Sequence, residues 1–227
     1  MVKKVRVRRF NFNKFLKFIL YITIISVSLY FLSKIRIKNI VIKGNRYVSD
    51  LEIMETTHLD KYPSYFKTLG FSVENTIKKN YPLVKSVKVR KGVGFKITIT
   101  IEEYKILYLV RSNNEYVLED GTRLSDINVE SNVPILINYV PDDVENKLIS
   151  KLSSVDKEVL DKISEIEYYN TSYDSERFLL YMNDGNQVYI TLNKIKEFNN
   201  YFKIKKELGK HKGILYLDSG NYFEIKE

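Results

Sequence analysis

The sequence predicts an α+β protein in which one N-terminal transmembrane helix precedes two domains built from helices and strands. Three observations lead to this expectation. Residues 18–33 form an uncharged hydrophobic run. After it, apolar residues alternate with polar ones at the period of two that is typical of strands, and elsewhere they recur at helical spacing. The part of the chain that follows the run is also long enough for one or two domains with buried cores.

The hydrophobic run is predicted to cross a membrane. Ten of the sixteen residues in 18–33 are Phe, Ile, Leu or Val, and each favours insertion by roughly 0.3 to 0.6 kcal/mol. A helix of this length rises about 24 Å, and extension to Phe15 brings it close to the ~30 Å hydrocarbon core. The alternative is a cleaved signal peptide, but no small-x-small cleavage site follows the run and the chain has no Ala. We therefore expect a retained signal anchor over residues 15–33.

Nearly all of the excess positive charge lies beside this run. Seven Lys or Arg residues fall within the first 17 residues, whereas residues 44–227 carry 26 basic and 28 acidic side chains. Because positive residues stay on the cytoplasmic side, residues 1–14 are predicted to be a cytoplasmic basic tail, with the C-terminal part outside the cell. A nucleic-acid-binding protein would carry its basic surface on the folded domain. The net charge of +9 therefore indicates contact with the cell membrane and argues against nucleic acid as a partner.

Residues 35–103 are predicted to form the first domain, in the order strand, helix, helix, strand, strand. Isoleucines over residues 35–42 indicate the first strand, which ends at a Gly44-Asn45 turn. Ser49 and Glu52 have the spacing of a capping box, which predicts the start of a short helix. The expected apolar face of this helix consists of Leu51, Ile53 and Met54.

The second helix of this domain is expected over residues 72–79, because Pro82 prevents its continuation. Val87 and Val89 alternate with basic residues, and isoleucines alternate with polar residues after the Gly92-Val93-Gly94 turn. This pattern predicts a hairpin with one buried and one solvent-facing side. The buried side is expected to carry Ile97, Ile99 and Ile101.

Residues 104–227 follow without a Pro-, Gly- or Ser-rich linker and are predicted to form a mixed α/β domain with a mainly antiparallel sheet. Seven apolar residues at helical spacing predict one helix over residues 145–163. A turn at Asn183–Asn186 predicts a hairpin between strands. The expected strands are 104–110, 116–118, 177–182, 187–191, 214–217 and 222–225, with an apolar segment at 133–140 and a second helix at 194–208 that ends at Gly209.

Motifs for catalysis, metal binding or cofactor binding are weak throughout the chain. There is no Cys, and the two histidines, His58 and His211, have no ligand spacing around them. Ser64-x-x-Lys67 and Ser154-x-x-Lys157 match the nucleophile motif of penicillin-binding proteins, but 17 Ser and 28 Lys produce about two such spacings by chance. We therefore expect no enzymatic activity, no cofactor, no metal site and no small-molecule substrate. The expectation that remains is a membrane-tethered scaffold that binds other proteins.

The order of elements over residues 35–103 resembles a POTRA domain, and the details resemble the FtsQ/DivIB family of bacterial cell-division proteins. Each motif is loose, so the resemblance rests on their order and spacing over essentially the whole chain. The motifs are Ile37-x-x-Ile40-x-Ile42-x-Gly44-Asn45, Ser49-x-x-Glu52-Ile53, the strands at 81–89 and 97–102, Tyr116-Val117-Leu118-x-Asp120-Gly121, Val133-Pro134-Ile135-Leu136, the helix at 194–208 and Ile214-x-Tyr216-Leu217-Asp218.

The resemblance implies a non-enzymatic divisome scaffold at the division septum that supports septal cell-wall assembly. Its implied partners are two bitopic proteins, one FtsL-like and one FtsB/DivIC-like, bound outside the membrane. The alternative is a POTRA-bearing component of a secretion or membrane-protein assembly system. An unpaired edge strand offers its backbone N–H and C=O groups to a partner strand, which favours the terminal strands as the docking site. The alternative is that residues 222–225 form a paired edge strand that binds no partner. The expected protein-binding residues are Leu215, Tyr216, Leu217, Tyr222, Phe223 and Ile225.

Overall fold

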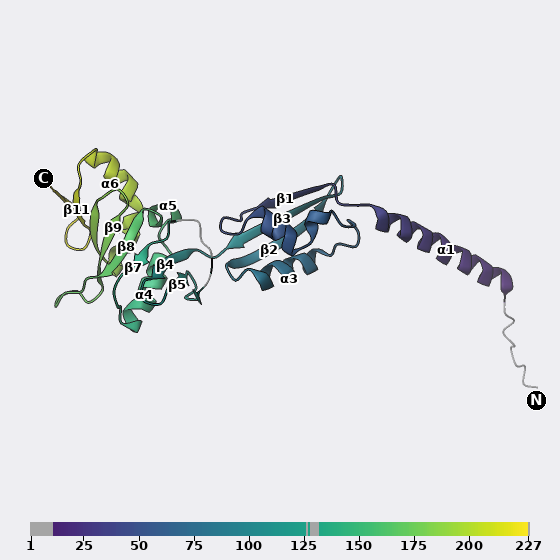
Figure 1. Ribbon diagram of the computed structural model, residues 1–227, viewed down its shortest axis with the longest axis horizontal. Coiled ribbons are helices and arrows are strands. Elements are labelled where there is room, and N and C mark those ends of the chain that lie inside the picture. Colours follow the sequence, from purple (N-terminus) through teal and green to yellow (C-terminus); the bar gives the residue numbers. More distant parts are fainter. Residues whose placement is uncertain (1–10, 126, 128–131, 227) are drawn as a thin grey trace, which may run out of the picture. The chain divides into compact units, whose positions relative to one another are not determined.

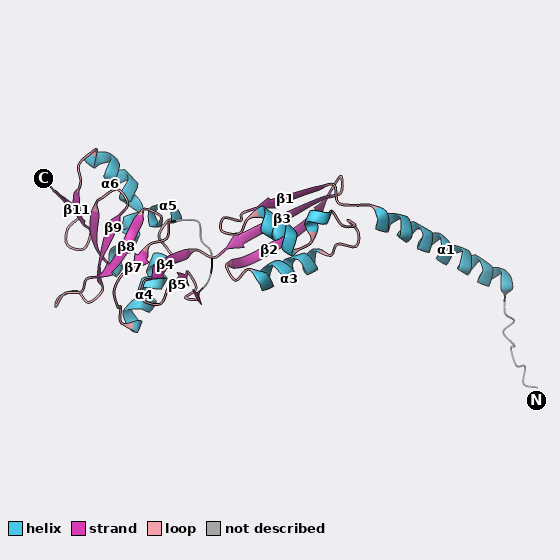
Figure 2. Ribbon diagram, in the orientation of Figure 1, coloured by secondary structure: helices cyan, strands magenta, loops and turns pink. Residues whose placement is uncertain are grey.

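The computed structural model describes residues 11–125, 127 and 132–226 of the chain. Helices and strands are labelled in Figure 1 where there is room, and Figure 2 colours them by type. The chain divides into two units, of which the second contains residues 82–85 and 103–227. The first unit contains the remaining residues, up to Glu102.

The first unit begins with helix α1 (Phe12–Lys34), which starts where the Asn11 side chain accepts a hydrogen bond from the Lys14 backbone N–H at 3.2 Å. Among the described residues, α1 is the one helix that is long and apolar enough to cross a membrane. None of its side chains is buried. The helix contains the whole predicted span of 15–33, whereas residues 1–10 of the predicted basic tail lie outside the described residues.

A three-stranded sheet in the order β1–β3–β2 forms the centre of the first unit. Strand β1 runs parallel to β3, with Asn39 opposite Lys96 and Lys43 opposite Thr100. The expected order of elements is confirmed, and Ile97, Ile99 and Ile101 are buried. The elements are β1 (Asn39–Lys43), α2 (Asp50–Thr56), η1 (Leu59–Lys61), α3 (Gly70–Asn80), β2 (Val84–Gly92) and β3 (Lys96–Glu103).

The predicted capping box is present at the start of α2. The Glu52 N–H donates to Ser49 Oγ at 3.2 Å, and the Ser49 N–H donates to Glu52 Oε2 at 3.0 Å. The backbone bond from Ser49 is the main reason why the pKa of Glu52 is lowered. The predicted apolar face is wrong at Leu51, whose side chain is 64% exposed, because only Ile53 of this helix is fully buried.

The first strand is shorter than predicted, because β1 begins at Asn39. Residues 35–38 bond elsewhere: the Ile37 N–H donates to the Pro63 carbonyl, and the Tyr65 N–H donates to the Ile35 carbonyl at 2.9 Å. Ile37 is nevertheless buried, as its place in the isoleucine pattern predicts.

A nine-stranded sheet in the order β12–β11–β10–β9–β8–β7–β4–β5–β6 forms the second unit. Five of its eight neighbouring pairs are antiparallel, so the expected mainly antiparallel sheet is confirmed. Apolar residues of α4, α5 and η2 build one core with the strands. The strands are β4 (Ile106–Val110), β5 (Glu115–Leu118), β6 (Arg123–Leu124), β7 (Ile135–Leu136), β8 (Ile163–Tyr168), β9 (Arg177–Met182), β10 (Gln187–Thr191), β11 (Gly213–Tyr216) and β12 (Tyr222–Ile225).

The single helix predicted over residues 145–163 is wrong, because the structure has two helices, α4 (Asp142–Leu152) and α5 (Lys157–Leu160). The serines between them interrupt the helix. Ser153 Oγ donates to the Ser150 carbonyl at 2.7 Å, and Ser154 Oγ donates to the Lys151 carbonyl at 2.6 Å. Such local bonds give the backbone an alternative to helix propagation.

The sequence does not predict strand β8, whose first residue, Ile163, has the helical spacing of the predicted helix. The register between β8 and β9 shifts between Ile163 and Glu165. A shift of this kind breaks the alternation of buried and exposed residues that identifies a strand. In β8 the buried residues Ile163 and Ile166 are therefore three apart, a spacing that a helix also gives.

The helix predicted over residues 194–208 is present as two segments, η2 (Leu192–Asn200) and α6 (Tyr201–Leu208). Because η2 is a 3-10 helix, the residues that follow it face differently from those of a continuous α-helix. Phe202 is exposed, and its neighbour Tyr201 is buried. Strands β9 and β10 have the predicted bounds, whereas β6 was not predicted.

Candidate protein-binding site

Strand β12 lies at one edge of the nine-stranded sheet and, within the described part of the chain, pairs with β11 alone. The pairing is antiparallel, with Leu215 opposite Phe223 and Tyr216 opposite Tyr222. The two strands are joined by a turn at 217–221. Asp218 in this turn accepts a hydrogen bond from Arg177 Nε at 2.6 Å, which ties the hairpin to β9.

The backbone groups of β12 point alternately toward β11 and away from the sheet. Just past the strand, the Lys226 N–H donates to the Lys212 carbonyl at 2.9 Å, so these two residues form a hydrogen-bonded pair. Bonded and non-bonded pairs alternate along an antiparallel ladder. Glu224 and Tyr222 therefore also bond to β11. The residues whose N–H and C=O groups point outward are Phe223 and Ile225.

The six predicted binding residues divide into a buried and an accessible group. Leu215 and Leu217 are buried in the core, where they pack β11 against the helices. Tyr222 is 51% exposed and Ile225 is 53% exposed. The accessible group consists of Tyr216, Tyr222, Phe223 and Ile225.

A groove of about 610 Å³ runs beside this edge, between the β11–β12 hairpin and the helical segments η2 and α6. Leu215 and Leu217 form its floor, and Phe223 belongs both to the groove and to the outward-facing edge. The groove thus places apolar surface next to unpaired backbone groups. The other lining residues are Glu197, Asn200, Lys203, Ile204, Glu207, Leu208, Asn221 and Tyr222.

A row of stacked aromatic rings crosses β12, β11 and β10. The rings of Tyr222 and Tyr216 stack with centroids 4.5 Å apart, and Tyr216 stacks on Tyr189 at 5.3 Å. The guanidinium of Arg177 lies 4.0 Å from the centroid of the Tyr189 ring, as a cation–π pair. The hydrogen bond from Tyr216 Oη to Glu224, 3.0 Å long, raises the pKa of Tyr216 to about 12.

Sequence reasoning missed Tyr189 and Arg177. The alternation in residues 187–191 already separates Tyr189 from the buried residues of its strand. However, only the parallel pairing of β10 with β11 places Tyr189 opposite Tyr216. That pairing joins segments about 27 residues apart in the chain, and non-local pairings of this kind are not specified by any local motif.

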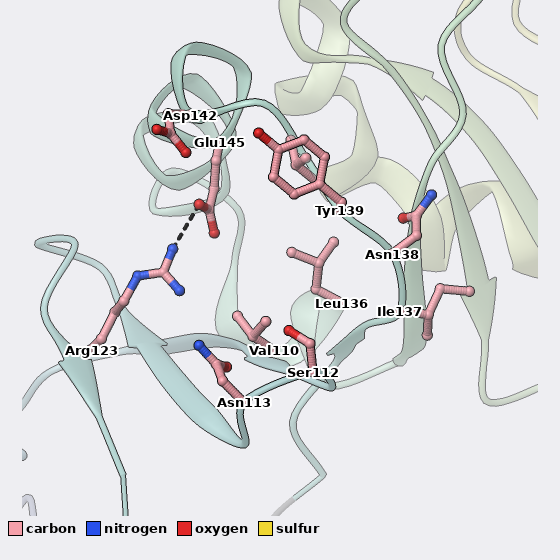
Figure 3. Close-up of a pocket in the computed structure, with 11 residues that line it drawn as sticks. Val110, Ser112, Asn113, Arg123, Leu136, Ile137, Asn138, Tyr139, Asp142 and Glu145 are labelled. Atoms are coloured by element: carbon pink, nitrogen blue, oxygen red, sulfur yellow. Dashed lines mark hydrogen bonds and ion pairs between the residues drawn. The ribbon is translucent and has the colours of Figure 1, made fainter.

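A second cavity, of about 430 Å³, is shown in Figure 3. Arg123 points toward Glu145 there and donates to its carboxylate at 2.7 Å. Tyr108 Oη donates to the same carboxylate at 2.9 Å, and burial raises the pKa of this phenol. These bonds fix α4 to β4 and β6. Tyr139, which is mostly exposed, points over the opening.

The Ser-x-x-Lys spacing at Ser154 is not assembled as a nucleophile. Ser154 Oγ donates to the Lys151 carbonyl, and the ammonium of Lys157 pairs with Asp161. The lysine is therefore held by a carboxylate rather than aimed at the hydroxyl that it would have to activate.

Comparisons with known proteins agree with this architecture. Residues 35–104 match the family model of the POTRA domain, FtsQ-type, which confirms the expected POTRA domain. Residues 108–219 match the model of the cell division protein FtsQ/DivIB, C-terminal.

The relatives are cell-division proteins. Cell division protein DivIB of Bacillus cytotoxicus is 31% identical over 220 residues, which cover 92% of this chain and 86% of that protein. DivIB of Bacillus subtilis is 32% identical over 198 residues, covering 83% of this chain and 74% of that protein. Among solved structures, the extracytoplasmic domain of DivIB from Geobacillus stearothermophilus, in its trans isomer, aligns with a TM-score of 0.40 at 26% identity, over 47% of this chain and 95% of that chain. The sequence alignments with DivIB proteins and the family models give the chain a role in cell division, and it belongs to the FtsQ/DivIB family.

Proposed function

We propose that this protein is a non-enzymatic divisome scaffold that captures an FtsB/DivIC-like partner, together with an FtsL-like one, at the free edge of β12 and thereby supports septal cell-wall assembly. The observation that carries the proposal is the outward direction of the Phe223 and Ile225 backbone groups on an edge strand. Membership of a cell-division family supports the cellular role.

The edge of β12 has the features that strand addition requires. Outward N–H and C=O groups on two residues provide a partner strand with up to four backbone hydrogen bonds, which give affinity. Specificity comes from side chains on the two faces of the added strand. One face meets the groove beside Phe223, and the other continues the stacked tyrosine row that ends at Tyr222.

Proline at the outward positions tests this edge. Ile225→Pro removes an N–H that a partner strand needs but leaves the bonds between β12 and β11 in place. We expect binding of a DivIC-like ectodomain, measured by calorimetry, to weaken by more than about tenfold, or ~1.4 kcal/mol. Ile225→Ala is the matched control, because it shortens the side chain and keeps the N–H; it should bind within about threefold of the unchanged protein.

Tyr222→Pro and Phe223→Pro complete the series. The Tyr222 N–H faces β11, so Tyr222→Pro should loosen the hairpin itself, seen as faster amide exchange in β11. Phe223→Pro should keep the hairpin and lose the partner. If Ile225→Pro and Phe223→Pro are folded and both bind normally, β12 is not the docking edge.

We further propose that α1 is a retained signal anchor, with its N-terminus in the cytoplasm and both folded units outside the cell, at the division septum. The basic residues that precede the helix support this orientation. Protease added to wall-stripped cells should degrade the chain beyond residue 34 and protect the first 17 residues. A soluble fragment that begins near Lys34 would instead show that the helix is cleaved.

A further inference from the structure

Three segments of the first unit meet at the residues that directly follow α1. The Tyr65 N–H donates to the Ile35 carbonyl, and the Ile37 N–H donates to the Pro63 carbonyl at 3.0 Å. The Lys38 N–H donates to the Phe95 carbonyl, also at 3.0 Å. The segment around Pro63 and Tyr65 and the segment around Phe95 are therefore bonded to residues that lie no more than four positions beyond Lys34, where α1 ends. We call residues 34–38, 58–71 and 88–96 together the anchor-proximal surface.

Aromatic rings hold these segments together. Tyr65, Phe66 and Phe95 form an edge-to-face cluster with centroid distances of 5.3 to 6.5 Å. Tyr65 Oη donates to the Gly92 carbonyl at 3.0 Å, and the Lys91 ammonium lies 4.9 Å from the Tyr65 ring centroid. The hairpin tip and the segment before α3 are therefore one connected structure.

Large apolar side chains of this surface point into solvent. Phe66 is 44% exposed, Leu69 is 61% exposed and Phe71 is 69% exposed. Val93, at the tip of the β2–β3 hairpin, is fully exposed. Apolar side chains gathered in this way on one end of a small domain mark an interaction site rather than ordinary surface.

The positive charge of the two-helix, three-strand domain is concentrated at the same end. The anchor-proximal surface carries nine basic residues and a single acidic residue, Asp60. Residues 39–57, 72–87 and 97–103, which make up the rest of the two-helix, three-strand domain, carry five basic and six acidic residues. The basic residues of the anchor-proximal surface are Lys34, Arg36, Lys38, Lys61, Lys67, Lys88, Arg90, Lys91 and Lys96.

We propose that the anchor-proximal surface lies in the headgroup layer of the membrane that α1 crosses, with anionic phospholipid as its ligand. The inference rests on the proposed role of α1 as an anchor. Aromatic rings are favoured at the boundary between headgroups and acyl chains, and lysines and arginines bind anionic headgroups. The short connection to α1 keeps this surface beside the bilayer, so contact requires no search in solution. The lipid thus orients the POTRA domain relative to the membrane.

The chain contains no Trp, which allows a single-tryptophan test in the full-length protein. Phe66→Trp and Leu51→Trp variants are reconstituted in vesicles of phosphatidylcholine and phosphatidylglycerol with brominated acyl chains. Leu51 is the matched control, because it is an apolar residue of the same unit that is even more exposed than Phe66 and lies outside the anchor-proximal surface. We expect bromine to quench the Phe66→Trp emission by roughly half or more, as for side chains at the acyl boundary, and to leave Leu51→Trp nearly unchanged.

Charge reversal provides a second test of binding to anionic lipid. Lys67→Glu combined with Arg90→Glu should reduce the quenching of Phe66→Trp, as should removal of phosphatidylglycerol, because both weaken the attraction to anionic headgroups. Lys78→Glu combined with Lys79→Glu in α3 makes the same charge change outside this surface and should leave the quenching as it was.

Two outcomes overturn the proposal and are distinguishable. Protein that floats with the vesicles but shows equally weak quenching at both tryptophans has its anchor in the bilayer and its anchor-proximal surface in water, which leaves that surface for a protein partner. Protein that does not float contradicts the anchor as well. Neither outcome affects binding at β12, which the Ile225→Pro series measures separately.

Discussion

Replacing Ile99 with alanine should destabilise the POTRA domain by about 2–5 kcal/mol, because the removed methyl groups leave a cavity that the surrounding core cannot fill. Ile99 lies in β3, the central strand of the three-stranded sheet, and is fully buried. Its neighbours on the same face, Ile97 and Ile101, are buried as well, so no mobile surface side chain can move into the space.

Thr98→Ala is the matched control, since Thr98 points to the opposite face of the same strand and is only half-buried. Its cost should stay well below 1 kcal/mol. Hydrogen exchange on the full chain, read by mass spectrometry, reports each unit separately, which a single unfolding curve for a chain of two units does not. Equal losses of protection in the two variants would show that the register of β3 is wrong.

The POTRA domain was predicted well from sequence because its signals are local. The capping box at Ser49, the glycine turn at residues 92–94 and the alternation along β3 each specify an element within a few residues. The predictions for this domain were wrong where tertiary contacts determined the burial or the pairing of a residue. Leu51 has the helical spacing of a core residue but is exposed, and residues 35–38 pair with a distant segment instead of extending β1.

The second unit was harder to predict because its sheet depends on pairings between distant segments. The apolar residues of 155–163 are buried as expected, but two serines end the helix and a register shift conceals β8. The two strands of the terminal hairpin are predicted by the sequence, yet the direction of the Phe223 and Ile225 backbone groups follows only from the observed register. Likewise, the alternation along β10 shows that Tyr189 is not in the core, but only its pairing with β11 reveals the ring row.

Gly213→Ala should abolish the proposed docking edge, with a loss of DivIC-like binding of about a hundredfold or more, or ~2.8 kcal/mol. A Cβ atom at Gly213 would lie 1.9 Å from the carbonyl oxygen of Glu224, a backbone atom of β12. No rotamer change relieves a clash with backbone, so β12 must move away from β11. Gly213 itself is fixed by a buried bond from its N–H to Asn186 Oδ1, 3.0 Å long, which prevents β11 from yielding instead.

Gly220→Ala in the turn of the same hairpin separates this clash from a general effect of replacing glycine. The nearest atom to a Cβ at Gly220 is Tyr222 Cδ1 at 3.6 Å, an ordinary contact, so binding should change little. Hydrogen exchange should show that the backbone amides of β12 lose their protection in Gly213→Ala and keep normal protection in Gly220→Ala. Normal binding by Gly213→Ala despite a displaced β12 would mean that the partner does not read the strand edge. Because Gly213→Ala moves the side chains of β12 together with its backbone, it tests the position of the whole strand. The Ile225→Pro and Ile225→Ala pair, which keeps β12 bonded to β11, then shows whether the partner binds through strand addition.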